Sequence, residues 1–193
     1  MIKERMLLII DGGYLDFIQR SFGSPRLDYG RLANAICDHF GYNMYRAIYF
    51  NCLPHQSQPP TEEEKEAYEK KRGFYQRLEK LERFEVKLGH LAFRGVDGQT
   101  GKPVLEQKQV DVLITAEMVY AAARRNVPAI ALLSGDGDFL PACELVKREG
   151  LTFALVHGSR SGSFLTVHEA LWQAADLRLE ITKEFIEPFL REG

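Results

Sequence analysis

Residues 129–138 read Ala-Ile-Ala-Leu-Leu-Ser-Gly-Asp-Gly-Asp, and this stretch decides the fold. Its first half is short, continuous and apolar, which is typical of a strand buried on both faces of a sheet. Its second half carries Asp136 and Asp138 directly after that strand. In an open parallel sheet, ligands bind beyond the carboxyl ends of the strands, near the point where the strand order reverses. The stretch therefore predicts an α/β sheet with a polar site at one edge.

Two further aspartates stand in comparable positions. Asp11 ends the apolar run 6–10, and Asp111 opens the apolar-rich stretch 110–114. If the acids converge, each pair repels by roughly 4 kcal/mol at ~4 Å and an effective dielectric near 20. Such a cluster must take up protons or bind a cation. A divalent metal is the usual solution, and metal-bound carboxylates indicate phosphoryl chemistry.

Strand-like and helix-like segments alternate along the whole chain. Strands are predicted at 6–10, 46–51, 84–91, 127–133, 151–156 and 177–181, and helices after Gly13 through Ile18 and at 28–40, 61–83, 110–125, 139–148, 163–175 and 183–190. The segments 54–60 and 93–108 are expected to be loops. This alternation predicts a mostly parallel sheet with helices on both faces. We expect a single domain over 1–193, with a core at about 6–179 and a C-terminal helix that packs on its own chain rather than on a second subunit.

Composition and charge exclude several classes of protein. The chain has 193 residues, 45% of them hydrophobic, with a formal net charge of -2. The net charge is not basic, so it gives no indication of nucleic-acid binding. Binding of a nucleic acid would need a local basic patch, or a metal that bridges to the phosphates. No apolar run approaches about 18 residues, and the first aspartate comes too early for a signal peptide. The three cysteines form no CxxC or zinc pattern, so we expect a cytoplasmic protein without a membrane span.

Four sequence motifs resemble those of NYN domains, a branch of the PIN-like nucleases that includes LabA-like proteins. The first motif is 9–14, Ile-Ile-Asp-Gly-Gly-Tyr. The second is 108–112, Lys-Gln-Val-Asp-Val, with Glu117 after it, and the third and most specific is 133–139, Leu-Ser-Gly-Asp-Gly-Asp-Phe. The pair Ala175-Asp176 is similar to the Ala-Asp that closes many such domains. The resemblance covers about 6–179, and the motifs match in order and spacing.

The resemblance implies a three-layer α/β/α, PIN-like (Rossmann-like) fold and a ribonuclease that depends on Mg²⁺ or Mn²⁺. It makes RNA the expected partner of a monomer or homodimer. Asp11 and Asp136 are then expected to be direct or near-direct metal ligands. Asp111 would be a ligand or would orient the metal-bound water, and Asp138 would complete the pocket. One or two divalent ions held by carboxylates can both activate water and stabilise the leaving oxygen.

Two positions depart from the family pattern. The family commonly has Asn three residues after the first Asp, where this chain has Tyr14. A tyrosine cannot reproduce the paired donor and acceptor of an amide. The family often has Asp six residues after the middle one, where this chain has Glu117. Because six residues turn about 120° on a helix, Glu117 is a secondary candidate.

Other polar residues have both a functional and a structural interpretation. Ser134 is a candidate phosphate contact or a turn residue, and Asn51 reaches the crevice or simply ends a strand. Each acid taken alone also fits a structural role, as a helix N-cap for the later three and as a turn residue for Asp11. The cations expected to contact RNA phosphates are Arg94, Lys102, Lys108 and Arg160.

Two other functions stay open at the level of sequence. A phosphatase of the haloacid dehalogenase type also begins with an Asp after the first strand. That class needs a second Asp two residues later as its general acid, and here the position is Gly13. The second alternative is a non-catalytic RNA-binding or regulatory module with a degenerate site, for which Tyr14 and Glu117 would be signs of drift. No P-loop and no dinucleotide-binding glycine motif is present.

Overall fold

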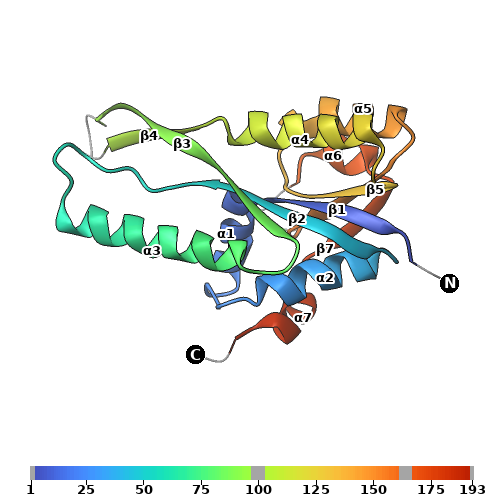
Figure 1. Ribbon diagram of the computed structural model, residues 1–193, viewed down its shortest axis with the longest axis horizontal. Helices are drawn as coiled ribbons and strands as arrows, with labels where there is room; N and C mark the ends of the chain where they lie inside the picture. The colour runs from blue at the N-terminus through green and yellow to red at the C-terminus, as the bar shows by residue number, and fades with distance from the viewer. Residues whose placement is uncertain (1–2, 97–102, 161–166, 192–193) are drawn as a thin grey trace.

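The computed structural model describes residues 3–96, 103–160 and 167–191, with only the backbone described at 91–94, 96 and 103–108. Its centre is a seven-stranded sheet in the order β4-β3-β2-β1-β5-β6-β7 (Figure 1). The strands are β1 (Arg5–Asp11), β2 (Asn43–Cys52), β3 (Phe84–Val96), β4 (Pro103–Lys108), β5 (Ala129–Leu133), β6 (Thr152–His157) and β7 (Leu177–Glu180). The neighbouring pairs are parallel, apart from β3 with β4. The predicted mostly parallel sheet is confirmed.

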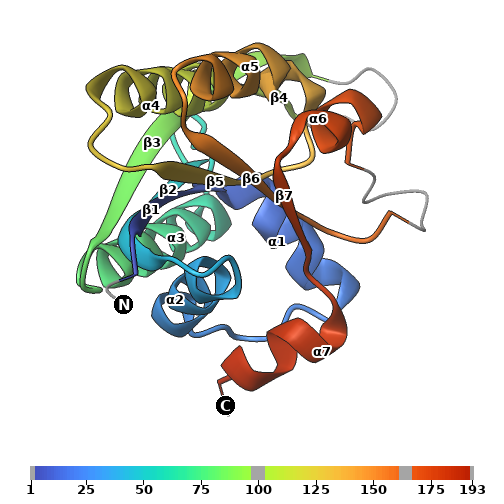
Figure 2. The same ribbon diagram turned by 90° about the vertical axis from the view of Figure 1, so that its right-hand side faces the viewer.

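Helices cover both faces of this sheet (Figure 2). One layer holds α1 (Gly12–Ser21), α2 (Tyr29–His39), α3 (Glu62–Glu79) and α7 (Lys183–Ile186). The other layer holds α4 (Val110–Arg124), α5 (Leu140–Arg148) and α6 (Glu169–Ala174). Two short 3-10 turns, η1 (Gly137–Phe139) and η2 (Glu187–Phe189), precede α5 and follow α7. The three-layer α/β/α architecture is therefore as the sequence predicts.

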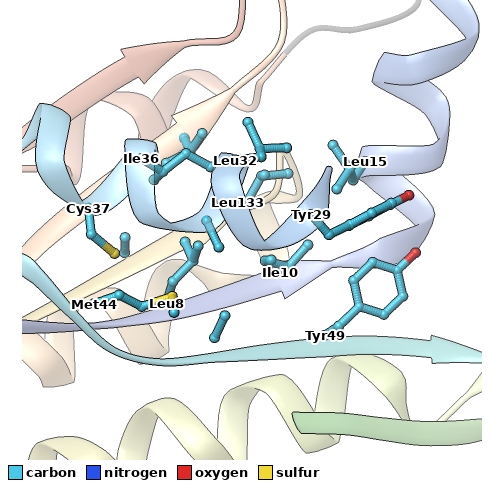
Figure 3. Close-up of a cluster of buried hydrophobic side chains, with 14 of the residues drawn as sticks. Leu8, Ile10, Leu15, Tyr29, Leu32, Ile36, Cys37, Met44, Tyr49 and Leu133 are labelled. Carbon is cyan, nitrogen blue, oxygen red and sulfur yellow. The ribbon is translucent and has the colours of Figure 1, made fainter. Parts of the chain in front are cut away.

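The central strand β1 explains why its sequence is apolar throughout. Side chains alternate between the two faces of a strand. Leu8 and Ile10 belong to the hydrophobic cluster under α1, α2 and α3, whereas Leu7 and Ile9 belong to the cluster under α4 and α5. Figure 3 shows Leu8 and Ile10 against the side chains of α2. With a core on each face, β1 has no solvent side that would call for polar residues.

Side-chain caps fix the starts of α2 and α3. Asp28 accepts a hydrogen bond from the Arg31 N–H at 3.0 Å and starts α2 one residue later, close to the predicted 28–40. Thr61 and Glu64 form a capping box at the start of α3, which begins one residue after the predicted 61. These caps satisfy N–H groups that have no partner within the helix. The segment predicted as one helix over 163–175 has α6 at its end, and residues 161–166 lie outside the described residues.

The predicted polar loop at 93–108 is wrong. β3 continues to Val96, and β4 runs antiparallel to it, with His90 paired to Lys108 and Phe93 to Leu105. The missed signal is Asp97-Gly98, because an Asp-Gly pair between two strands is typical of a hairpin. Pro103 is compatible with the first position of an edge strand. The glycines of the segment and Pro103 favour a loop, and for this reason the sequence predicted no strand there.

The C-terminal segment packs on its own chain. Ile186 is buried in the cluster under α2, and Phe185 and Phe189 pack against it. Leu190 forms an isolated antiparallel bridge with Leu27. The predicted helix over 183–190 is shorter, because it tightens to a 3-10 turn at Glu187 before Pro188. Within this single chain, the C-terminal segment thus packs on its own core.

Two sequence-level exclusions can be compared with the described part of the chain. No helix within it combines the length and the apolar character needed to cross a membrane. Cys37, Cys52 and Cys143 are all free thiols, and Cys37 and Cys143 are buried. Burial raises the pKa of each of these two thiols to about 12, which makes them unreactive core residues.

Candidate active site

The candidate site lies at the carboxyl ends of β1 and β5. These strands are neighbours, with Ile10 paired to Leu133, and Asp11 is the last residue of β1. The chain runs outward from β1 in one direction through β2 and β3 and in the other through β5, β6 and β7. The boundary between β1 and β5 is thus the topological switch point, where a crevice for ligands is expected.

Asp11 is held by two hydrogen bonds. Its Oδ1 accepts from the Tyr14 N–H at 3.1 Å, so Asp11 is the N-cap of α1. Its Oδ2 accepts from the Ser134 hydroxyl at 3.0 Å. Ser134 is fully buried and also accepts from the Asp136 N–H at 3.3 Å. Ser134 therefore fixes the acid after β1 relative to the turn after β5, which is both a structural and an organising role.

Asp136 and Asp138 lie on that turn. The Asp136 Oδ1 accepts from the Asp138 N–H at 2.9 Å and caps η1. Both side chains are exposed. Capping uses one oxygen of Asp136 and leaves the other oxygen, and the whole Asp138 carboxylate, open to solvent. Asp136 is thus an N-cap, as one interpretation of the sequence had it, and its second carboxylate oxygen is still free to bind a ligand.

Asp111 brings the fourth carboxylate from the other layer. It stands in the first turn of α4, after Gln109, whose left-handed backbone (φ 74°) turns the chain from β4 into the helix. Its side chain is exposed. We call Asp11, Asp111, Asp136 and Asp138 the acid cluster.

The pKa values show that the acid cluster is electrostatically coupled. Burial raises the pKa of Asp11, and the negative charge of Asp111 adds to the rise. The hydrogen bonds from Tyr14 and Ser134 act in the opposite direction. Partial burial also raises the pKa of Asp111, followed by repulsion from Asp136 and Asp138. Each acid therefore lies within electrostatic reach of another.

No cation of the chain offsets this charge within the described residues. The ion pairs formed there include none to any member of the acid cluster. A cluster of like charges without a counter-charge is unfavourable and is relieved by protons or by a bound cation. The site thus has the electrostatics of a cation site.

The donor set fits a hard divalent cation, but its spacing is loose. Across residues 3–96, 103–160 and 167–191, no three His, Cys, Asp or Glu side chains are grouped closely enough to hold an ion as they stand. Oxygen donors without sulfur or imidazole are those that Mg²⁺ and Mn²⁺ prefer. Mg²⁺ keeps several of its waters and needs few direct protein ligands. The chemistry of the donors therefore fits Mg²⁺ or Mn²⁺.

Tyr14 packs against the turn after β5. A Cβ added to Gly135 would meet the Tyr14 ring at 2.6 Å, so only glycine leaves room for this ring. The Tyr14 hydroxyl accepts from the Gly158 N–H at 3.0 Å and thereby ties α1 to the end of β6. Burial raises the pKa of Tyr14. Tyr14 is thus a packed neighbour of Asp11, and it supplies no amide to the crevice.

Asn51 and Glu117 are engaged elsewhere. The Asn51 amide donates to the Tyr49 hydroxyl at 3.2 Å and to the Asp16 Oδ2 at 3.5 Å. Glu117 forms an ion pair with Lys87 of β3. The structure therefore brings neither secondary candidate into the acid cluster.

Asp16 and Lys71 were missed by sequence reasoning. The Lys71 ammonium lies 2.7 Å from the Asp16 Oδ2, and both side chains are only about a quarter exposed (28% and 25%). The Tyr49 hydroxyl is within 3.4 Å of Asp16 Oδ1. Lys71 was hidden in a mixed-charge helix that reads as a solvated face. The only available signal was its place on the apolar side of α3, with Tyr75.

His168 was also missed as a neighbour of the turn. Its backbone N–H donates to the Gly135 carbonyl at 2.9 Å. A Cβ on Gly137 would meet the His168 ring at 2.5 Å. His168 is exposed, and its ring lies against the Asp136-Gly137-Asp138 turn.

The four predicted RNA contacts divide into two groups. Arg160 stacks over the Trp172 ring at 3.9 Å and pairs with Glu169 at 2.7 Å, so its guanidinium is already positioned. The backbones of Arg94 and Lys108 lie in β3 and β4, which lead to Asp111, and Lys102 falls outside the described residues.

The closing Ala175-Asp176 is structural, because Asp176 accepts from the Phe153 N–H at the opposite end of the sheet.

Comparisons with known proteins support this architecture. The family model of the NYN domain matches residues 5–176. A crystal structure of a protein of unknown function from Vibrio parahaemolyticus has a TM-score of 0.65 and 22% identity, covering 98% of this chain and 97% of that one. The Thermotoga maritima CheB methylesterase catalytic domain has a TM-score of 0.43 and 13% identity over 97% of this chain and all of that one. No curated protein matches. The first likeness shows the fold, and the second carries no inference.

Proposed function

The chain belongs to the NYN domain family, and from this membership we propose that it is a metal-dependent ribonuclease that hydrolyses RNA phosphodiester bonds at the acid cluster. The family places the chain in the PIN-like nuclease superfamily. The observation that carries the proposal is a set of four carboxylates at the switch point of the sheet, whose repulsion adds to the raised pKa of Asp11 and Asp111 and which form no ion pair among the described residues. A metal-assisted phosphodiesterase needs carboxylates that bind a divalent cation beside the place where the substrate binds.

The acids divide into two kinds by their surroundings. Asp11 is half-buried, with both oxygens oriented by hydrogen bonds, so it would anchor the metal in a fixed place. Asp111, Asp136 and Asp138 are exposed and would reach the metal or its waters from two other elements. When bound, a divalent ion supplies a water of lowered pKa and stabilises the charge on the leaving oxygen.

The remaining residues of the chain act by positioning. Ser134 holds Asp11 against the β5 turn and limits the rotation of that carboxylate. Gly135 admits the Tyr14 ring, which keeps the start of α1 packed against β6. Without a bound cation the acid cluster repels an RNA phosphate. Cleavage should therefore depend strictly on metal.

A specific observation favours a second candidate function, a non-catalytic RNA-binding module. Tyr14 stands where the family commonly has an amide, and its hydroxyl is already used by the Gly158 N–H. The loose spacing of the acid cluster points the same way. In this case RNA would bind without being cut.

The decisive experiment incubates a mixed single-stranded RNA pool with Mn²⁺, Mg²⁺ or EDTA. Wild type is compared with Asp11→Asn and Asp136→Asn, and Asp38→Asn on exposed α2 serves as the matched control. We expect cutting that requires metal, disappears in the two site variants and persists in the control. Bound but uncut RNA with wild type would replace the ribonuclease by the binding module. Equal cutting by all four proteins would assign the activity to a contaminant.

A further inference from the structure

A cavity lies away from the acid cluster, on the side of the sheet that carries α1, α2 and α3. It has a volume of about 710 Å³ and opens between α3, the connection from α1 to α2, and the C-terminal segment. Figure 1 shows α2 and α3 on the same side of the sheet, with the C-terminus below them. Its lining combines the cations Arg26, Lys70, Arg77 and Arg191 with the aromatic rings of Tyr29 and Phe74.

The rim of the cavity is strongly basic. Its described lining contains four cationic side chains and no acidic one. Arg191 pairs with Asp28 at 3.4 Å, whereas Arg26, Lys70 and Arg77 make no side-chain ion pair within the described part of the chain. Three unpaired cations facing one cavity repel each other, and an anion between them relieves that repulsion.

The floor of the cavity is aromatic and rigid. The rings of Tyr29 and Phe74 meet edge to face, with centroids 5.3 Å apart. The Tyr29 hydroxyl donates to Gln19 Oε1 at 3.0 Å, and the Gln19 amide donates to the Pro25 carbonyl at 3.0 Å. These bonds lock one wall of the cavity. A half-buried Phe74 offers a flat apolar face next to the cations.

The C-terminal segment completes the wall. The Asp28 N–H donates to the Phe189 carbonyl, and the Arg191 N–H donates to the Arg26 carbonyl, both at 2.8 Å. Together with the bridge between Leu27 and Leu190, these bonds tie the end of the chain to the connection before α2. Backbone hydrogen bonds within the chain therefore hold this wall of the cavity in place.

We propose that this cavity binds a nucleoside monophosphate unit, with its phosphate held by Lys70, Arg77 and Arg26 and its base against Phe74. Phosphate beside cations and a base on an aromatic ring are the two contacts by which proteins hold single-stranded nucleotides without reading sequence. The unit is a nucleotide of an RNA strand or a free mononucleotide. The proposal goes beyond the ribonuclease function, because binding here requires neither metal nor the acid cluster.

The position of the cavity fits a strand that also reaches the acid cluster. Asp11 caps the start of α1, and Gln19 in the same helix lines the cavity. Eight residues of α-helix span about 12 Å. A few nucleotides of extended RNA cover that span. One short rigid helix thus connects the two sites.

The test measures binding in EDTA, so that cleavage plays no part. Adenosine monophosphate and a fluorescein-labelled 12-nucleotide RNA are titrated against wild type, Lys70→Gln/Arg77→Gln and the matched control Arg72→Gln/Lys80→Gln. Both doubles remove two positive charges, the control from Arg72 of α3 and from Lys80, the C-cap of α3, and the control positions do not line the cavity. Circular dichroism and the melting temperature verify that each variant is folded.

We expect the cavity double to weaken binding of at least one ligand by about tenfold, and the control double to change it less than about twofold. For the RNA, loss of this one phosphate contact should flatten the slope of log K against log salt by about 0.7. An effect on both ligands identifies a site open to free nucleotides, and an effect on RNA alone identifies a strand subsite. Equal affinities of the two doubles for both ligands would overturn the proposal. Cleavage assayed separately with Mn²⁺ shows whether the ribonuclease stands or fails on its own.

Discussion

Asp11 and Asp16 lie five residues apart, at the N-cap and in the body of α1. Their charges differ in compensation, because only Asp16 forms an ion pair among the described residues. Asp16 has an ammonium at 2.7 Å and hydroxyl and amide donors around it. Asp11 has two neutral donors and further carboxylates nearby, without a cation among the described residues. Five residues turn about 140° round a helix, so the two acids face different neighbours.

The difference separates structure from function. A partly buried carboxylate is stable when a cation and hydrogen bonds compensate it, and Asp16 shows that this chain can supply such a cation. Leaving the acid cluster uncompensated costs stability, and such costs are typical of functional sites. Asp16 with Lys71 is thus a structural pair. The acid cluster has no such ion pair among the described residues, and it is the place where we propose that an external cation binds.

The largest expected effect is on the rate of RNA cleavage, when Asp is replaced by Asn once in the acid cluster and once in the pair of Asp16 and Lys71. Asp136→Asn should lower the rate of RNA cleavage in Mn²⁺ by about a thousandfold, or roughly 4 kcal/mol of transition-state stabilisation. Asp16→Asn should lower it less than about threefold, because that carboxylate faces Lys71 and not the crevice. Single-turnover cleavage of a labelled RNA measures both. A loss in Asp16→Asn as large as that in Asp136→Asn would erase the distinction.

Mn²⁺ should stabilise the folded protein only when the acid cluster is intact, whether or not Asp16 keeps its charge. Mn²⁺ at a hundred times its dissociation constant adds about 2.7 kcal/mol to the folded state, or about 5–10 °C for a chain of this size. We expect this rise in melting temperature for wild type and for Asp16→Asn, and its loss in Asp11→Asn. Differential scanning fluorimetry with Mn²⁺ and EDTA gives the result. A similar rise in Asp11→Asn would place the ion elsewhere.

The sequence predicts the acid cluster because its members follow directly from strand ends. An apolar run followed by an aspartate fixes both the strand and the position of the acid, so Asp11, Asp136 and Asp138 needed only the sheet order to meet. Asp111 was a candidate because it opens an apolar-rich stretch, and its place in the middle NYN-like motif added support, since a helix start carries no such strand signal.

The compensated pair and the basic cavity escaped sequence reasoning for a physical reason. Asp16 and Lys71 are 55 residues apart and meet only because α1 and α3 pack on the same face of the sheet. Lys71 lies among many exposed charges of α3, and a helical pattern does not show which of them a neighbouring helix will cover. The hairpin of β3 and β4 was missed because a strand at the edge of a sheet is free to be polar and lacks the apolar run that marks β1.

Breaking the compensated pair should cost stability without touching the site. Lys71→Met keeps most of the side-chain stem but leaves Asp16 without its cation, and we expect a loss of about 1–3 kcal/mol in the free energy of unfolding. The matched control is Lys65→Met, which removes an exposed surface pair with Glu62 and should change stability by less than about 0.5 kcal/mol. Urea denaturation measures both. Equal losses would mean that the pair of Asp16 and Lys71 is no more than a surface contact.

The smallest effect has the opposite sign and comes from relieving the acid cluster. The pKa of Asp111 is raised in the folded protein above its ordinary value of 3.8, so the folded state holds this proton more tightly than the unfolded state. Stability from this group is therefore present below the ordinary value and is lost as pH rises through the folded pKa. At pH 7 in EDTA, Asp111→Asn should raise stability by at most ~0.5 kcal/mol, because the exposed site is screened and the N-terminus of α4 favours the charge. The gain should shrink from pH 7 towards pH 4, as followed by melting temperature. A loss of stability in Asp111→Asn, as expected for Lys71→Met, would mean that the charge at Asp111 is already compensated.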